Sequence, residues 1–187
     1  MILVVGTILS GFYSWRVEMA TLKQEIQKAI RDMLIEYTDC PANNIFCGYN
    51  NKVELPQSND YIVFTVLNPV RTGTPLLVNE STQEAGKMTS YQDFRIEVQI
   101  DFYGNFAFDR ANDIINISRT DFLCEFFKPY NVQPIACDDA RNLTGVSGED
   151  EYVERWMVGL EIDYRDAVSV SQEVFNTAEL NIFETEL

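Results

Sequence analysis

Two stretches of the chain repeat apolar residues at the three- and four-residue spacing of an amphipathic helix. The first runs from Thr21 to about Tyr37, with Thr21 as the expected amino-terminal cap. The second runs from Asp109 to about Phe127, with Asp109 as its expected cap. A proline follows shortly after each stretch, as is typical where a helix ends. The pattern therefore predicts two helices far apart in the sequence.

Strict alternation of apolar and polar residues predicts two long strands, over Tyr91–Tyr103 and Glu151–Arg165. Each has one face for a core and one for solvent. Tyr61–Val66 is β-branched and aromatic throughout and is typical of a largely buried strand, which we expect Asn68-Pro69 to end. Two further short strands are expected, near Ile45–Tyr49 and Ile135–Cys137.

Residues 70–90 combine turn residues with many serines, threonines and asparagines. An excursion of this length in a compact domain usually has a function of its own, and we expect an extended hairpin arm that contacts another subunit. The candidate assembly residues of this arm are Arg71, Thr74, Leu76, Val78 and Lys87.

The order helix, strand, strand, helix, strand predicts an α+β fold. We expect a mainly antiparallel β-sheet with two amphipathic helices packed on one face and long hairpin or loop excursions. Residues 19–166 are expected to form the single domain, and residues 167–187 an acidic carboxyl-terminal extension. Trp15-Arg16 can be encoded by a purine-rich ribosome-binding sequence just before Met19, so residues 1–18 could be translated leader sequence with Met19 as the native start. The alternative is that residues 1–18 form a flexible amino-terminal arm.

The amino-acid composition excludes several classes of function. The 187 residues carry 14 Lys and Arg against 29 Asp and Glu, a net charge of -15, which argues against a protein that grips nucleic acid. The chain has no histidine, so histidine-based nucleophiles, bases and metal sites are excluded. The four cysteines form no C-x-x-C pair and are expected to be reduced thiols. The apolar run at the amino terminus is too short and interrupted to span a membrane. We expect no catalytic residue, cofactor or metal.

Five charged residues are candidates for polar contacts within or between subunits: Asp101, Arg110, Arg119, Asp121 and Arg155. Arg110 lies in the first turn of the second helix, where the helix dipole disfavours a cation, so we expect it to reach a carboxylate such as Asp101. If the two long strands pair, their arginines and carboxylates form cross-strand ion pairs on the wet face of the sheet.

Three segments carry a resemblance to a known family: Phe94–Gly104 (FRIEVQIDFYG), Ala107–Phe122 (AFDRANDIINISRTDF) and Tyr152–Tyr164 (YVERWMVGLEIDY). In these segments and in their order the chain resembles the bacteriophage neck or tail terminator proteins, also described as tail-completion proteins. The resemblance covers about Met19 to Asp166 and implies a small α+β structural subunit of the virion, at the junction of tail and neck. It also implies a homo-hexameric ring that caps the head-proximal end of the tail tube and stops its polymerisation.

The implied partners are further copies of the chain, the tail tube protein and the head-side connector, with DNA passing through the ring without specific binding. Residues 145–187 hold eleven acidic and two basic residues. This acidity either lines the channel with a repulsive wall for DNA or keeps the assembly soluble. Two alternatives to a terminator remain: another phage tail or oligomeric interaction module, and a cytoplasmic enzyme that uses carboxylates or cysteine.

Overall fold

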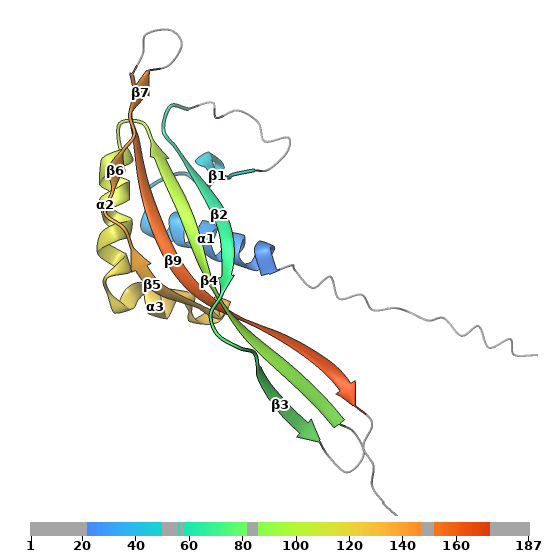
Figure 1. The fold of residues 1–187 in the computed structure, drawn as a ribbon. Coiled ribbons are helices and arrows are strands. Elements are labelled where there is room, and N and C mark those ends of the chain that lie inside the picture. The colour runs from blue at the N-terminus through green and yellow to red at the C-terminus, as the bar shows by residue number, and fades with distance from the viewer. Residues whose placement is uncertain (1–21, 50–55, 57, 82–85, 147–151, 173–187) are drawn as a thin grey trace, which may run out of the picture.

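The computed structural model describes residues 22–49, 56, 58–81, 86–146 and 152–172. The leader hypothesis for residues 1–18 and the cap expected at Thr21 lie outside these residues. The helices and strands follow in the order α1, β1, β2, β3, β4, α2, α3, β5, β6, β7, β8 and β9 (Figure 1). Short 3-10 turns at Ala42–Asn44 and Lys128–Tyr130 follow α1 and α3.

The main sheet has seven strands, of which five form the path β1-β2-β4-β9-β5. β3 pairs with β4 and β6 with β9, and all pairings are antiparallel except β1 with β2. β7 and β8 form a separate two-stranded sheet. The bounds are β1 Ile45–Cys47, β2 Tyr61–Arg71, β3 Leu76–Ser81, β4 Gly86–Tyr103, β5 Val132–Cys137, β6 Arg141–Asn142, β7 Gly145–Val146, β8 Tyr152–Val153 and β9 Arg155–Gln172.

Three α-helices cover one face of this sheet: α1 Leu22–Tyr37, α2 Ala107–Ser118 and α3 Asp121–Phe127 (Figure 1). The apolar face of β4, Ile96 to Phe102, packs between β2 and β9 beneath them and is fully buried. Ile30 and Met33 of α1 join the same core. Burial of this shared apolar surface holds the two layers together, which confirms the predicted α+β class.

The second predicted helix is two helices. Asp109–Phe127 was expected to be continuous, but α2 ends at Ser118 and α3 begins at Asp121. At the break the hydroxyl groups of Ser118 and Thr120 each donate to a carbonyl three residues earlier, at 2.7 Å, in place of a continuing helical ladder. Asp109 is also not the cap, because α2 begins at Ala107 with Phe106 in the capping position.

Four strands are longer than their patterns predicted. β4 begins at Gly86 rather than Tyr91, and β5 begins at Val132 rather than Ile135. β2 does not end at Asn68-Pro69 but continues to Arg71, with a register shift between Val66 and Pro69. Such an irregularity accommodates a proline that cannot donate a ladder hydrogen bond. β9 continues through residues 167–172, which we expected to belong to the carboxyl-terminal extension.

The extra strand length forms an arm. We use this name for β3 together with residues 86–91 of β4 and 167–172 of β9. These three segments pair as a ribbon, with β4 in the middle, and Figure 1 shows them projecting beyond the helices. The predicted hairpin over residues 70–90 is therefore present, with a third strand added from the end of β9.

At the opposite end of β4 the chain turns sharply at Gly104, whose φ is +96°. A Cβ at this position would lie 2.7 Å from the backbone oxygen of Asn59 and 1.9 Å from a carboxylate oxygen of Asp60. Gly73 has a similar φ of +85°, but a Cβ added to Gly73 would have no other atom within 4 Å. The two glycines therefore share the backbone requirement and differ in the space around them.

We expect Gly104→Ala to lower the free energy of unfolding by clearly more than Gly73→Ala. Both substitutions place a side chain in the left-handed region, at about 1 kcal/mol. Only Gly104→Ala also forces the Asn59 backbone away from the turn. Chemical denaturation of the two variants measures the difference, and equal losses would show that the turn at Gly104 has room to relax.

A hydrogen bond joins α1 to the sheet: the Tyr164 hydroxyl donates to Glu25 at 2.8 Å. Burial and this hydrogen bond raise the pKa of Tyr164 from its ordinary value of 10.0 to about 12. Because the folded protein holds this proton more tightly than the unfolded chain, the contribution to stability is complete below pH 10 and is lost as the pH rises toward 12.

Tyr164→Phe should therefore flatten the decline in the free energy of unfolding between pH 10 and pH 12. Denaturation curves of the parent and variant across that range measure the difference between the two slopes. Glu25→Gln is the matched control, and it should shift the Tyr164 titration, followed by ultraviolet absorbance, toward lower pH. Parallel slopes for parent and Tyr164→Phe would contradict the raised pKa.

Candidate assembly surfaces

The structure brings the five predicted assembly residues to one region of the subunit. Arg71 ends β2, Thr74 lies in the connection that follows, Leu76 and Val78 belong to β3, and Lys87 lies near the start of β4. Arg71, Thr74, Leu76 and Lys87 are exposed, and Val78 is half-buried. Their role in assembly stays a prediction, since placement alone does not test it.

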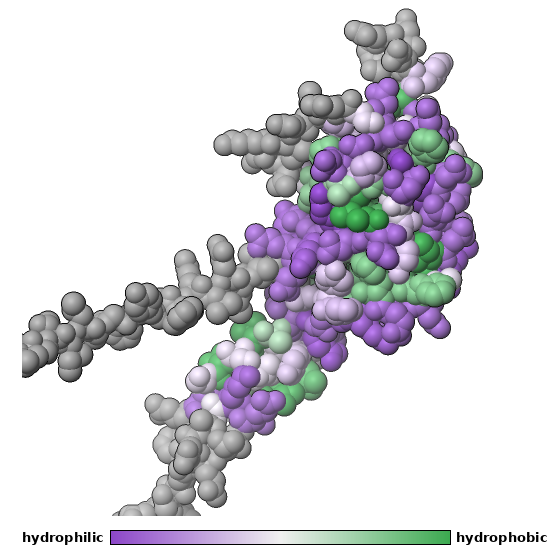
Figure 2. All heavy atoms as spheres, turned by 180° about the vertical axis from the view of Figure 1, so that it is seen from behind, coloured by the Kyte–Doolittle hydropathy of each residue, from purple (hydrophilic) through white to green (hydrophobic). Residues whose placement is uncertain are grey.

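One face of the arm carries four apolar side chains, Leu77, Met88, Val168 and Val170, beside the polar Asn79 and Ser90. Leu77 and Val168 flank Ser90 of β4, and Val170 lies beside Met88. Leu77 is 61% exposed and Val170 is 60% exposed. These side chains share the face on which the helices cover the rest of the sheet, but the helices do not reach the arm (Figure 1). Figure 2 shows apolar residues, in green, on the arm between paler and purple polar ones. Sequence reasoning missed Val168 and Val170.

The opposite face of the sheet carries a row of ion pairs between β4 and β9. Arg165 pairs with Asp93 at 2.6 Å, and Arg95 pairs with Asp163 at 3.1 Å. The hydrogen bond from Arg165 holds the pKa of Asp93 below its ordinary value. These cross-strand pairs agree with the interpretation of the alternating sequence as a wet sheet face.

Next along this face, Glu97 and Glu161 lie directly opposite each other. Both are exposed, and neither forms an ion pair with another described residue. Like charges at opposed positions repel, so this part of the face is locally acidic and disfavours contact with another acidic surface.

Asp101 and Arg155, two of the predicted polar residues, form a partly buried pair. Asp101 is 3% exposed and accepts hydrogen bonds from Arg155 at 3.0 and 2.9 Å and from Gln99 at 2.7 Å. The Arg155 guanidinium also lies 5.5 Å from the centre of the Tyr103 ring, which stacks on Tyr61. Burial raises the pKa of both tyrosines. These contacts join β2, β4 and β9 within one subunit.

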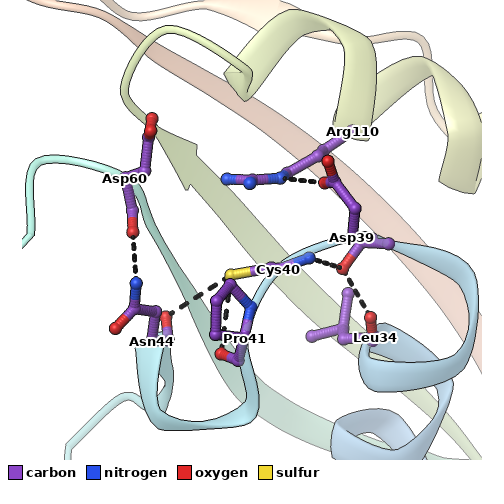
Figure 3. A network of polar contacts seen from close by, with 8 residues as sticks. Leu34, Asp39, Cys40, Pro41, Asn44, Asp60 and Arg110 are labelled. Carbon is purple, nitrogen blue, oxygen red and sulfur yellow. Dashed lines mark hydrogen bonds and ion pairs between the residues drawn. The ribbon is translucent and has the colours of Figure 1, made fainter.

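The sequence suggested Asp101 as the partner of Arg110, but Arg110 pairs with Asp39 instead. Its Nε donates to Asp39 at 2.8 Å, which ties α2 to the end of α1 (Figure 3). The residue is 5% exposed, and its Nη1 is buried without a hydrogen-bond partner, as is one carboxylate oxygen of Asp60. Figure 3 shows the guanidinium between Asp39 and Asp60. The cation is disfavoured by the helix dipole but compensated by a carboxylate outside its own helix.

Arg119 and Asp121 lie at the break between α2 and α3. Arg119 donates to Asp139 at 2.8 Å, and both side chains are exposed. Asp121 is exposed in the first turn of α3, where a carboxylate suits the helix dipole. The structure thus places the five polar candidates in three separate locations, and only Asp101 and Arg155 meet.

Groups suited to catalysis are few in the part of the chain that the structure describes. No cluster of three or more Cys, Asp or Glu there could hold a metal ion. The four cysteines are free, and burial raises the pKa of Cys40, Cys47 and Cys137, which keeps these thiols protonated. Among the described helices, none has the length and apolar character needed to cross a bilayer. The features that stand out are an exposed arm and a polar sheet face.

The fold and these surfaces define a small α+β protein with a projecting β-ribbon. A family model described as phage neck terminator protein matches residues 22–186, so the chain belongs to the phage neck terminator family. This confirms the resemblance drawn from residues 94–104, 107–122 and 152–164. The family is structural, and membership makes the protein a virion component that interacts with other phage tail or head proteins. No curated protein matches the chain.

We expect Asp101→Ala to lower the free energy of unfolding by about 2 kcal/mol, because Arg155 and Gln99 both lose a buried acceptor and Arg155 is only partly able to turn to solvent. The matched control is Asp163→Ala, which removes the exposed Arg95 pair and should have a much smaller effect. Chemical denaturation at moderate salt compares the two variants. An equal loss in both would show that burial of Asp101 contributes nothing to the pair.

Proposed function

We propose that the protein forms a homo-hexameric ring on the head-proximal end of the phage tail tube. There it stops tube polymerisation and joins the tail to the head-side connector, at the junction of tail and neck. Membership in the phage neck terminator family supports the proposal. The observation that carries it is the arm, a ribbon of three strands with exposed apolar side chains on one face and no helix over that face.

The free edges of the sheet also support ring formation. β1 pairs with only three residues of β2, from Ile62 to Phe64, so most of β2 has no neighbour on that side among the described residues. In the arm, the outer edges of β3 and of residues 167–172 likewise pair with nothing else that the structure describes. Open edges bind other chains readily, and closure into a ring covers them.

The acidic charge of the chain supports the proposal that DNA passes through the ring without being bound by it. The net charge of -15 makes attraction of phosphates unfavourable, and screening limits repulsion to about 8 Å at physiological salt. Carboxylates near the bore would therefore act on passing DNA, whereas those farther away keep the assembly soluble. Whether the carboxylates repel DNA at the bore or keep the assembly soluble, we expect the protein not to bind DNA.

Particles made without this gene test the proposed function directly. Electron microscopy should show overlong tails or tails without heads, because nothing ends the tube or joins it to the connector. Supplying the unaltered chain from a plasmid should restore normal tails. Normal virions in the absence of the gene would eliminate the terminator role.

A further inference from the structure

Exposed apolar side chains gather at two ends of the subunit. One is the arm and its base, with Val70, Leu76, Leu77, Val168 and Val170. The other, which we call the aromatic end, consists of Phe106, Phe108, Leu143, Tyr152 and Val153. These ten residues are most of the fourteen large exposed hydrophobic residues in the described part of the chain. Aromatic side chains that remain exposed in this way are typical of protein interfaces.

The two ends are too far apart to contact each other within one subunit. β4 begins in the arm at Gly86 and reaches the aromatic end at Tyr103. Its 18 residues span roughly 60 Å at about 3.4 Å per residue. Figure 1 shows the arm at one extremity and the turn after β4, next to β7, at the other. Whatever covers either end must therefore come from another molecule.

The aromatic end is hollowed by a groove with polar residues in its lining. A groove of about 470 Å³ lies between the Gly104 turn and β8, and Asn59, Asn105 and Asn142 are among the residues that line it. The side-chain oxygen of Asn142 already accepts a hydrogen bond from the backbone N–H of Thr144. Amide side chains both donate and accept hydrogen bonds. The edge of a strand presents unpaired N–H and C=O groups in a row, so the edges of the arm are a matching ligand for this groove.

The two ends also differ in their balance of charge. Arg71, at the base of the arm, is the one described arginine that neither pairs with a carboxylate nor donates to a backbone carbonyl. Lys87 of the arm lies opposite Glu80 in the β3–β4 ladder, so Arg71 is the cation in excess there. In the first two turns of α2, which begins at the aromatic end, Asp109 and Asp113 are exposed and have no partner among the described residues. An arm placed on this end would bring the positive charge of Arg71 toward these carboxylates.

We infer that the arm of each subunit docks on the aromatic end of the next copy of the chain. This inference rests on the ring proposed above and names its contact. A closed ring of more than two identical subunits needs two different, complementary surfaces on every subunit. The arm and the aromatic end supply such a pair, whereas a single self-complementary patch would stop at a dimer.

Photo-cross-linking in assembled tails tests the contact. Benzoylphenylalanine at position 77 should, on irradiation, link to residues 104–108 or 152–153 of a second copy, as mass spectrometry of the linked peptides would show. Links to the tube protein, or to another surface of a second copy, would overturn this contact and leave the proposed ring standing. Tails that contain no copy of the chain would overturn the ring as well.

Mixing two defective variants provides an independent test on purified tail tubes or in solution. The arm variant is Leu77→Asp with Val170→Asp, and the aromatic-end variant is Phe106→Asp with Tyr152→Asp. Each alone should associate at least tenfold more weakly than the parent chain. Their equimolar mixture should give a one-to-one pair and nothing larger, because only one intact contact can form.

A control variant separates this contact from general loss of apolar surface. Phe122 of α3 is 69% exposed and lies in neither cluster, so Phe122→Asp should assemble like the parent chain. Unchanged melting temperatures would show that all three variants fold. Normal assembly of the aromatic-end variant alone would overturn the inference, as would ring formation by the mixture.

Discussion

The pairing of β4 with β9 is the interaction on which the rest of the structure depends. The two strands have 18 residues each and pair without a register shift from Gly86 with Gln172 to Tyr103 with Arg155. Over one part of this length the helices cover the apolar face and make the core. Over the other part nothing described covers it, and the same ladder continues as the arm. The arm is thus rigidly connected to the core, because no loop separates them.

The ion pairs on the open face set the register of this ladder more than they add to its stability. Arg165 with Asp93 and Arg95 with Asp163 are solvent-exposed pairs, and such pairs contribute little. A slip of one residue, however, would turn every side chain to the other face and carry arginines into the core. The partly buried Asp101–Arg155 pair places the same constraint near the end of the ladder, where Tyr103 and Tyr61 add ring contacts.

Local pattern was enough to predict the parts of the fold with one wet face and one buried face. The alternation from Phe94 to Phe102 marked the core half of β4 because only that half is buried on one side. No helix covers the arm half of β4, and polar residues such as Lys87, Thr89 and Ser90 occupy it, so its sequence shows weaker alternation. Val168 and Val170 alternate with Ser169 and Ser171, and this period-two signal could have extended β9 to Gln172.

Contacts between distant residues could not be predicted in this way. Arg110 was an evident candidate for a charge partner, but Asp39 lies 71 residues earlier and becomes its neighbour only when α1 packs beside α2. The break at Arg119 depends on the hydroxyls of Ser118 and Thr120 turning back to the preceding helix, an option that competes with continued helix at any Ser or Thr. Sequence pattern therefore located the arm better than it located the partners of the ion pairs.

Net charge restricts how copies of this protein approach each other. Two molecules of charge -15 repel, and two open sheet faces would bring the opposed Glu97 and Glu161 of each copy together. The arm differs, because its described residues and Arg71 at its base carry two cations and only one carboxylate, Glu80. Contact through the arm therefore avoids most of the repulsion that opposes stacking of the faces. Acidity of the body and neutrality of the arm together favour association at the ends of the subunit over association through the faces.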